Sequence, residues 1–376
     1  MGGDAGATLR TAAASAAELG PELVAELDAG DMLGAIAGLP RQLTAGYASA
    51  RERLAGVFDG AGAAAPPARP TGLAVFGMGG SAIGADLILA ATSLGVPAAV
   101  VRGYDVPAWI GPQTLVIAAS YSGETEETFA CTALALERGC VPVCVASGGA
   151  LAALASARGL PLVTIPGGGQ PRACVGYLAM PILAALSAAG LTPPADAGVA
   201  EAAELLRAGN IEYGPDAAGP ANEAKALAAR LHKRQALVYG AGLTVPAARR
   251  WKGQINENAK APAFWNELPE LDHNELMGWT SLPHVAAASL AVFLGDGQGD
   301  ERLRRRATLT AGELEARGVD CVHAAARGSS RLARLFSLVQ LGDYASFYLA
   351  LLYGVDPTPV GAIQDFKAKL AGGAGG

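Results

Sequence analysis

Cysteine is scarce in this sequence of 376 residues, and its placement excludes two classes of fold. The cysteines are odd in number and show no Cys-x-x-Cys spacing: Cys131, Cys140, Cys144, Cys174 and Cys321. Disulfide frameworks and structural zinc sites both need paired or clustered cysteines. The pattern therefore predicts free thiols in a reducing compartment, and we expect a cytoplasmic protein.

The sequence also lacks a strong charge of either sign and has few aromatic residues. Its net charge is −6, the arginine cluster at Arg302–Arg306 is short, and aromatic residues make up 6%. A protein with this weakly negative net charge does not attract a polyanion, so we expect no nucleic-acid partner. One local pocket can still bind a small anion. Hydrophobic residues make up 51%, many of them alanine, which favours closely packed α/β layers.

The sequence predicts no membrane association. Leu276–Gly295 lacks charge over a length sufficient for a membrane helix, but it contains Pro283 and His284. We interpret this segment as a turn followed by a buried strand. The first twenty residues include Asp4 and Glu18 without a compact apolar segment, so they predict neither a secretory signal nor a transit peptide.

The length and the hydrophobic pattern together predict two domains. We expect N-terminal helices and a linker in residues 1–70, a first α/β domain in 71–195, a second in 196–356, and a C-terminal helix with a disordered Gly-rich tail in 357–376. Short apolar segments alternate with helical patterns in the first domain, beginning near residues 73, 98, 114, 141 and 160. This alternation predicts a doubly wound parallel sheet.

A repeat connects the two expected domains. An apolar strand, a Gly-x-Gly turn and a helix begin at Leu73 and again at Ala236, which suggests an internal duplication. In the first copy, Gly77-x-Gly79-x-x-Ala82 satisfies a relaxed dinucleotide fingerprint, with Arg102 about twenty residues further on. The alternative is structural, because glycines also let a turn pass close to a sheet.

A hydroxyl-rich loop follows the third expected strand and favours a phosphate group over a dinucleotide. Ser120, Ser122 and Thr125 precede a helix that begins near Glu126, and a second loop adds Gly79, Gly80 and Ser81. Hydroxyls and backbone N–H groups at helix N-termini form an anion cradle without lysine, which suits a sugar phosphate. Capping of the helix by Ser122 or Thr125 alone would leave the other hydroxyls unexplained.

These motifs resemble a known family. The segments GMGGSAIGADL and SYSGETEET are similar to the phosphate-binding loops of the sugar isomerase (SIS) domain, and PRACVGYL with NENAKAPAFWNELPELDHNELMGW resembles the bifunctional phosphoglucose/phosphomannose isomerases. The resemblance extends over about residues 70–370 and implies two SIS-type domains. It also implies phosphate binding through the cradle residues, a specificity role for Thr358, and a homodimer in which His273 completes the neighbouring subunit's site.

The same resemblance implies four catalytic residues: Arg172, Glu257, His273 and Lys367. Their chemistry fits aldose–ketose isomerisation, in which one carboxylate moves a proton between C1 and C2 through a cis-enediol. Glu257 is the expected base, and Arg172 would stabilise the enediolate oxygen unless it forms only an ordinary salt bridge. His273 would move a proton at the ring oxygen. Lys367, or less suitably Lys369, would assist ring opening.

Three further expectations concern neighbouring charges. Glu124 replaces an asparagine often found in such loops, and a carboxylate there would repel phosphate unless it points to solvent. We expect Lys260 to pair with a carboxylate. His273 and Glu275 could suggest a metal site, but no third ligand has suitable spacing, so we expect neither metal nor cofactor.

The sequence thus predicts a metal-independent isomerase that interconverts glucose 6-phosphate and mannose 6-phosphate with fructose 6-phosphate. Two alternatives remain. A non-catalytic sugar-phosphate sensor would keep the cradle but would not need Glu257, Arg172 and His273. A nicotinamide-dependent dehydrogenase would need the Gly77 turn but would leave the hydroxyl loop unexplained.

Overall fold

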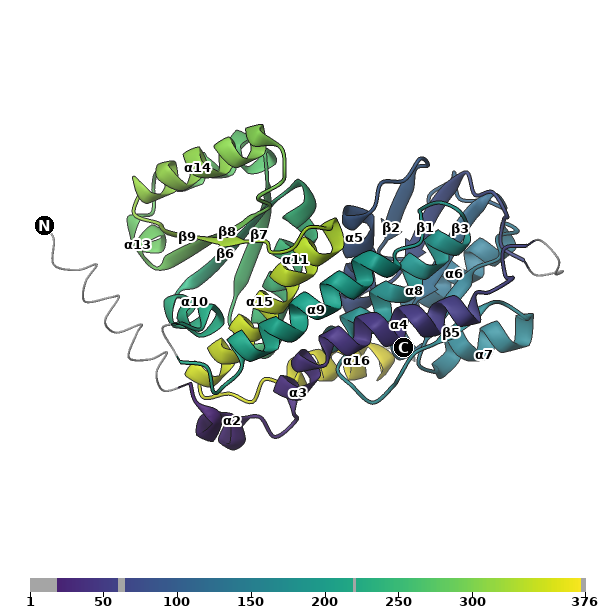
Figure 1. Ribbon diagram of the computed structural model, residues 1–376, viewed down its shortest axis with the longest axis horizontal. Helices are drawn as coiled ribbons and strands as arrows, with labels where there is room; N and C mark the ends of the chain where they lie inside the picture. The colour runs from purple at the N-terminus through teal and green to yellow at the C-terminus, as the bar shows by residue number, and fades with distance from the viewer. Residues whose placement is uncertain (1–18, 60–64, 219–220, 373–376) are drawn as a thin grey trace, which may run out of the picture.

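The computed structural model describes residues 19–59, 65–218 and 221–372, and it contains two parallel β-sheets with helices on both faces (Figure 1). This arrangement confirms the predicted fold class. The cores of the two sheets merge, because one continuous apolar cluster includes side chains from both. The predicted disordered tail at residues 373–376 lies outside the described residues.

The first sheet consists of the five predicted strands in the order β2-β1-β3-β4-β5. Their bounds are Gly72–Phe76 (β1), Ala98–Val101 (β2), Thr114–Ala119 (β3), Val143–Ala146 (β4) and Leu162–Thr164 (β5). Because β1 and β3 are neighbours and the chain leaves them in opposite directions, their carboxyl ends form the topological switch point where α/β proteins bind ligands. The predicted glycine and hydroxyl loops follow these two strands.

Helices cover both faces of this sheet. Helices α5 (Gly79–Ala91) and α8 (Val175–Ala188) pack on one face, against alternate side chains of β1 and β3. Helices α6 (Glu126–Glu137) and α7 (Gly149–Arg158) lie on the other face. Burial on both faces explains why these strands are continuously apolar rather than alternating.

The second sheet is also parallel, in the order β7-β6-β8-β9. Its strands are Gln235–Ala241 (β6), Ala263–Leu268 (β7), Ser289–Gly295 (β8) and Asp320–Ala325 (β9). The segment expected to be a turn and a strand forms the short helices α12 (Glu275–Gly278) and α13 (Pro283–Ala287) and then β8. Strand β7 was not predicted. Its flanking helices include α10 (Glu223–Leu231), α11 (Val245–Asn258) and α14 (Glu301–Glu315).

The predicted repeat is visible in the backbone of the two Gly-x-Gly turns. Gly79 after β1 has φ +49°, and Gly242 after β6 has φ +55°. Both values lie in the left-handed region that glycine adopts without penalty. A Cβ on Gly77 would lie 3.1 Å from the Ala119 carbonyl oxygen, so the first turn does need close backbone approach.

Long helices join the two sheets (Figure 1). Helix α4 (Leu39–Arg53) packs along α8 and α9 (Asp196–Tyr213), and it follows the short helices α2 (Pro21–Leu27) and α3 (Met32–Ala37). Helix α15 (Arg331–Leu352) contacts α9, α10 and α11. It is long and apolar enough to cross a membrane, but 94% of its most apolar window is buried inside the molecule.

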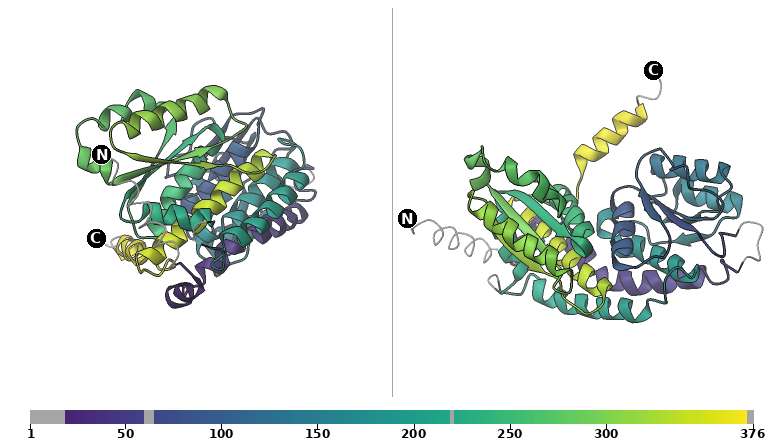
Figure 2. Two further views of the ribbon diagram at one scale, coloured as in Figure 1. Left: turned by 60° about the vertical axis from the view of Figure 1, so that its left-hand side comes forward. Right: turned by 90° about the horizontal axis from the view of Figure 1, so that it is seen from above.

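The last helix, α16 (Gly361–Gly372), projects away from both sheets (Figure 2). Its large apolar side chains Ile363, Phe366 and Leu370 are 44%, 62% and 59% exposed. Their spacing of three and four residues places them on one helical face. The strands of the two sheets fall within the predicted ranges 71–195 and 196–356, while the domain boundaries themselves stay predictions.

A buried ion pair anchors helix α11 to the core. Arg250 binds the carboxylate of Asp343 on α15 at 2.7 and 3.1 Å, and both side chains are 3% exposed. Gln254, one turn along α11, donates to the same carboxylate at 2.8 Å. Arg250 also donates to the backbone carbonyl oxygen of Arg172 at 2.8 Å. The pair thus ties the second sheet to a segment that follows the first.

We predict that Asp343→Ala destabilises the fold strongly, because it leaves the Arg250 charge buried without a counter-ion. The free energy of unfolding, measured by urea titration, should fall by about 3–5 kcal/mol. Glu204→Ala is the matched control, since it breaks the exposed Arg207–Glu204 pair, and it should cost at most about 1 kcal/mol. Similar losses in both variants would contradict the anchoring role.

Candidate active site

The predicted phosphate cradle forms at the carboxyl edge of the first sheet. Val75 and Phe76 of β1 lie in register with Ile117 and Ala118 of β3, so the loops after the two strands are adjacent. One loop begins α5 with Gly79, Gly80 and Ser81. The other carries Ser120, Ser122 and Thr125. The structure therefore brings together the residues that were predicted to bind phosphate.

Ser120 organises the hydroxyl loop from within. Its Oγ donates to Thr125 Oγ1 at 2.9 Å and accepts from the backbone nitrogens of Gly123 and Thr125 at 3.1 and 3.4 Å. The side chain is buried, and these three contacts use its hydrogen-bonding capacity. Ser122 is exposed and Thr125 half-buried. In this geometry Ser120 shapes the cradle, while Ser122 and Thr125 are accessible to an anion.

Neither α5 nor α6 has a side-chain N-cap. Thr125 occupies the N-cap position of α6, but its hydroxyl accepts from Ser120 instead of from the helix. Simple capping therefore does not explain Thr125. The backbone N–H groups in the first turns lack the usual side-chain acceptor and can bind an anion.

Glu124 is directed away from the cradle by a neighbouring helix. Its Oε1 accepts from the backbone nitrogen of Ala150 at 2.9 Å, in the first turn of α7. A carboxylate is stabilised there by the helix dipole. Glu124 is also exposed, as the solvent-facing alternative expected, but its bond to α7 was not foreseen.

Arg172 is held by contacts on nearly every nitrogen. It lies in the short 3-10 helix η1 (Pro171–Ala173) and is 4% exposed. Nε donates to Asn258 at 2.7 Å, and Nη2 donates to the carbonyl oxygens of Pro357 and Thr358 at 2.8 and 2.9 Å. This is more than the ordinary salt bridge considered from sequence. Nη1 is the nitrogen that faces Glu257.

Glu257 lies at the C-terminal end of α11. Its Oε2 is 3.6 Å from Arg172 Nη1, and its side chain is 35% exposed. Burial lowers the pKa of the Arg172 guanidinium, whereas the Glu257 carboxylate opposes that shift. The pair therefore combines a fixed cation with a carboxylate that solvent or a ligand can reach.

The cradle and the Arg172–Glu257 pair belong to one site. A Cβ on Gly80 would lie 2.9 Å from the carbonyl oxygen of Pro171, so the first turn of α5 touches the segment that carries Arg172. No larger residue fits at this contact without movement. Thr358 also reaches this region through its carbonyl bond to Arg172.

His273 and Lys367 lie elsewhere within a single chain. His273 ends the 3-10 helix η3 (Glu270–His273) beyond β7, and Lys367 is exposed on the projecting helix α16 (Figure 2). Among the described residues, no hydrogen bond or ion pair joins either side chain to Arg172 or Glu257. Their catalytic roles stay predictions, as does the specificity role of Thr358.

Sequence reasoning missed several residues that support the site. Asn258 holds Arg172, and its Nδ2 donates to Ser346 at 3.0 Å. Gln170 accepts from Arg172 Nη1 at 3.2 Å. Nothing in the segment NENAK distinguishes a supporting Asn258 from a surface residue until α15 is packed against it.

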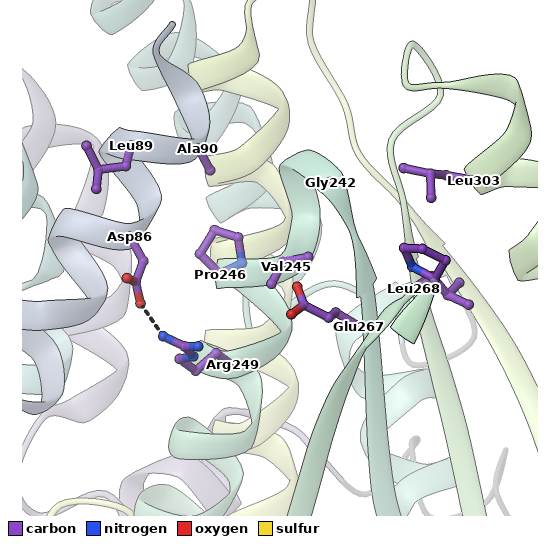
Figure 3. Close-up of a pocket in the computed structure, with 11 residues that line it drawn as sticks. Asp86, Leu89, Ala90, Gly242, Val245, Pro246, Arg249, Glu267, Leu268 and Leu303 are labelled. Carbon is purple, nitrogen blue, oxygen red and sulfur yellow. Dashed lines mark hydrogen bonds and ion pairs between the residues drawn. The ribbon is translucent and has the colours of Figure 1, made fainter. Parts of the chain in front are cut away.

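A cavity of about 480 Å³ lies apart from these residues, at the carboxyl edge of the second sheet (Figure 3). Its charged lining groups are Asp86, Arg249 and Glu267. Arg249 binds Asp86 at 3.0 Å, and Asp86 also binds Arg102. With its arginine neutralised and two carboxylates present, this cavity does not suit phosphate. The pairing of Arg102 also removes the support it gave to a dinucleotide site.

Comparison with known proteins identifies a family and a fold for this chain. Residues 220–370 match a family described as "Bacterial phospho-glucose isomerase C-terminal SIS domain". A hypothetical protein from Thermus thermophilus has the same fold, with a TM-score of 0.76, 17% identity and coverage of 98% of this chain and 96% of its own. Residues 220–370 are therefore of the SIS-domain class.

Two curated relatives are more specific. The bifunctional phosphoglucose/phosphomannose isomerase of Caldicellulosiruptor bescii is 40% identical over 79% of this chain and 88% of its own length. The Aquifex aeolicus protein of the same name is 36% identical over 80% and 90%. The chain belongs to the bifunctional phosphoglucose/phosphomannose isomerase family.

We predict that the accessible hydroxyls dominate anion binding at the cradle. The double variant Ser122→Ala with Thr125→Ala should raise the Kd for inorganic phosphate, measured by calorimetry, at least about tenfold, because hydrogen bonds to charged groups contribute about 1.5–3 kcal/mol each.

The matched control is Ser187→Ala with Thr192→Ala, another hydroxyl pair, whose oxygens lie 3.2 Å apart near the C-terminal end of α8. It should bind phosphate like the unchanged protein. An unaltered Kd in the Ser122 and Thr125 variant would remove the phosphate assignment.

Proposed function

We propose that this protein interconverts glucose 6-phosphate and mannose 6-phosphate with fructose 6-phosphate. The observation that carries the proposal is the Arg172–Glu257 pair beside a hydroxyl cradle at the switch point of the first sheet. Curated relatives with this name cover most of the chain. A sensor would need the cradle alone, and a dehydrogenase would need a dinucleotide site.

In the proposed mechanism, Glu257 is the single acid–base group for proton transfer between the carbons. The cradle holds the phosphate, and the open-chain sugar extends toward α11. Glu257 removes the proton from C2 of the aldose and delivers it to C1, while a proton is lost from O2 and one is gained at O1, which gives the ketose. Because both oxygens of the cis-enediol lie on one side, a single carboxylate can reach both carbons. Its partial exposure and its position beside a cation support this role.

Arg172 stabilises the charge that develops on the enediolate oxygen. Its guanidinium is already fixed by Asn258, Pro357 and Thr358, so little reorganisation accompanies the reaction. Gln170 and Glu257 share the Nη1 side, which is the side available to the sugar. Arginine suits this position because it keeps its proton when buried. The specificity role of Thr358, whose carbonyl oxygen binds Arg172, is part of the same proposal.

We infer that the active form is a homodimer. His273 and Lys367 lie away from the Arg172–Glu257 pair in one chain, and α16 presents the exposed apolar face Ile363, Phe366 and Leu370. A second copy could cover that face and supply His273 for ring opening. A cytoplasmic location is proposed on the free state of all five cysteines, four of them buried.

We expect Glu257→Gln to bind sugar phosphate but to lose isomerisation. The amide keeps the side-chain shape and cannot accept the proton, so kcat should fall about 10²–10⁴-fold. Turnover is measured by a coupled assay with fructose 6-phosphate, and proton transfer by deuterium uptake from solvent at C2 of the aldose. Glu267→Gln, in β7, is the control and should remain active.

Near-normal turnover in Glu257→Gln would exclude Glu257 as the base. An inactive but phosphate-binding unchanged protein would instead favour the sensor. Activity without any solvent exchange would point to hydride transfer.

Subunit mixing tests the proposed homodimer. If His273 completes the partner's site, an inactive Glu257→Gln protein mixed with an inactive His273→Ala protein should regain activity, because some heterodimer sites contain both intact residues. About a quarter of the unchanged activity is the expected ceiling for random exchange of equal amounts. The mixture of each variant with itself is the control. No recovery after demonstrated exchange would show that each site forms within one chain.

A further inference from the structure

Lys260 has a backbone conformation that lysine rarely adopts. It follows the C-terminal end of α11 with φ +56°. This left-handed region costs a residue with a Cβ roughly 1–2 kcal/mol, and glycine usually occupies such a position. The side chain should therefore contribute something that glycine cannot.

The ammonium group of Lys260 joins two parts of the candidate site. Nζ donates to the carbonyl oxygen of Glu257 at 2.5 Å and to that of Pro357 at 3.0 Å. The first bond satisfies a carbonyl in the last turn of α11, where a cation is favoured. These hydrogen-bond acceptors are backbone carbonyls, while the carboxylates of Asp356 and Glu257 are near enough to raise the pKa of Lys260, so the expected pairing with a carboxylate stays a prediction.

Two cations share the Pro357 carbonyl oxygen. Arg172 Nη2 donates to it at 2.8 Å and Lys260 Nζ at 3.0 Å. Burial and the nearby Arg172 charge both lower the pKa of Lys260. The common acceptor and the nearby Asp356 and Glu257 carboxylates offset the repulsion between the two positive groups. Without Lys260, the Pro357 carbonyl oxygen would accept from Arg172 alone, and the Glu257 carbonyl oxygen in the last turn of α11 would lose its bond to Nζ.

We propose that Lys260 is a positioning residue for isomerisation: by joining the Glu257 carbonyl to the Pro357 carbonyl, it fixes the Glu257 carboxylate relative to the Arg172 guanidinium. The inference rests on the proposed function. Lys260 acts through Glu257 and Arg172 and does not itself bind the sugar. It also fixes residues 356–360, which lead into α16.

Three substitutions separate the charge from the backbone. Lys260→Gly relieves the left-handed strain and removes the cation, Lys260→Met removes the cation and keeps the aliphatic chain, and Lys260→Arg keeps a cation. Lys233→Gly is the matched control, because Lys233 is another lysine with positive φ, at +61°. Its backbone nitrogen donates to Tyr353, away from the site.

We expect Lys260→Gly and Lys260→Met to lower kcat about 10²-fold, the loss typical of a displacement near 1 Å at a reacting group. KM for fructose 6-phosphate should change less than about threefold, because the cradle is untouched. Lys260→Arg should recover most of the rate, and Lys233→Gly should match the unchanged protein. The melting temperature of Lys260→Gly should stay near normal, since strain relief offsets the lost bonds.

Amide hydrogen exchange gives a second readout that does not depend on turnover. Exchange in residues 356–363 should accelerate in the Gly and Met variants and remain normal in Lys260→Arg and Lys233→Gly. Unchanged kcat in Lys260→Met, or unchanged exchange in this segment, would overturn the proposal. If Lys260→Gly does not fold, Lys260→Met decides. If the unchanged protein does not isomerise sugar phosphates, the proposed function fails, while the exchange comparison still decides the role of Lys260.

Discussion

The candidate site depends on the buried ion pair between Arg250 and Asp343. This pair fixes helix α11 against α15, and the second contact of Arg250 holds the backbone of Arg172. Burying two charges is costly unless their remaining donors and acceptors are satisfied. Here Gln254 donates a further hydrogen bond to the Asp343 carboxylate. The ion pair lies where helix α11 must hold Arg172 in a defined position.

Polar side chains on one face of α11 connect the Arg250–Asp343 pair to the candidate site. Arg250, Gln254 and Asn258 are spaced four residues apart, and Glu257 follows Gln254 by three, so all four lie toward one side of the helix. The first two bind Asp343, Asn258 binds Arg172, and Glu257 faces the same guanidinium. A shift of α11 along its axis would therefore displace the base and its cation together.

The sequence predicted most of the fold because the buried strands are short apolar segments with clear breaks. It missed β7, in which the polar residues Asn266 and Glu267 interrupt the apolar pattern. It also did not identify α15, which is buried on almost every side and so has little helical periodicity. The cradle was foreseeable from its hydroxyls and glycines. The contacts of Glu124 and Lys260 were not, because each bonds to backbone that only tertiary packing brings near.

The duplication explains why the two domains contribute different chemistry. In the second domain Thr244 lies in the turn after β6, where its hydroxyl accepts from Ala241 and donates to the Leu294 carbonyl at 2.8 Å. That hydroxyl closes the turn and is not available to an anion. The domain instead supplies Glu257 from the C-terminal end of α11, which lies toward the opposite edge of its sheet because a crossover helix runs antiparallel to its strands. In the proposed mechanism, phosphate affinity and proton transfer therefore come from the two halves of the predicted repeat. Their relative position is set by the continuous core between the sheets, so substitutions at that core should alter turnover without touching either group.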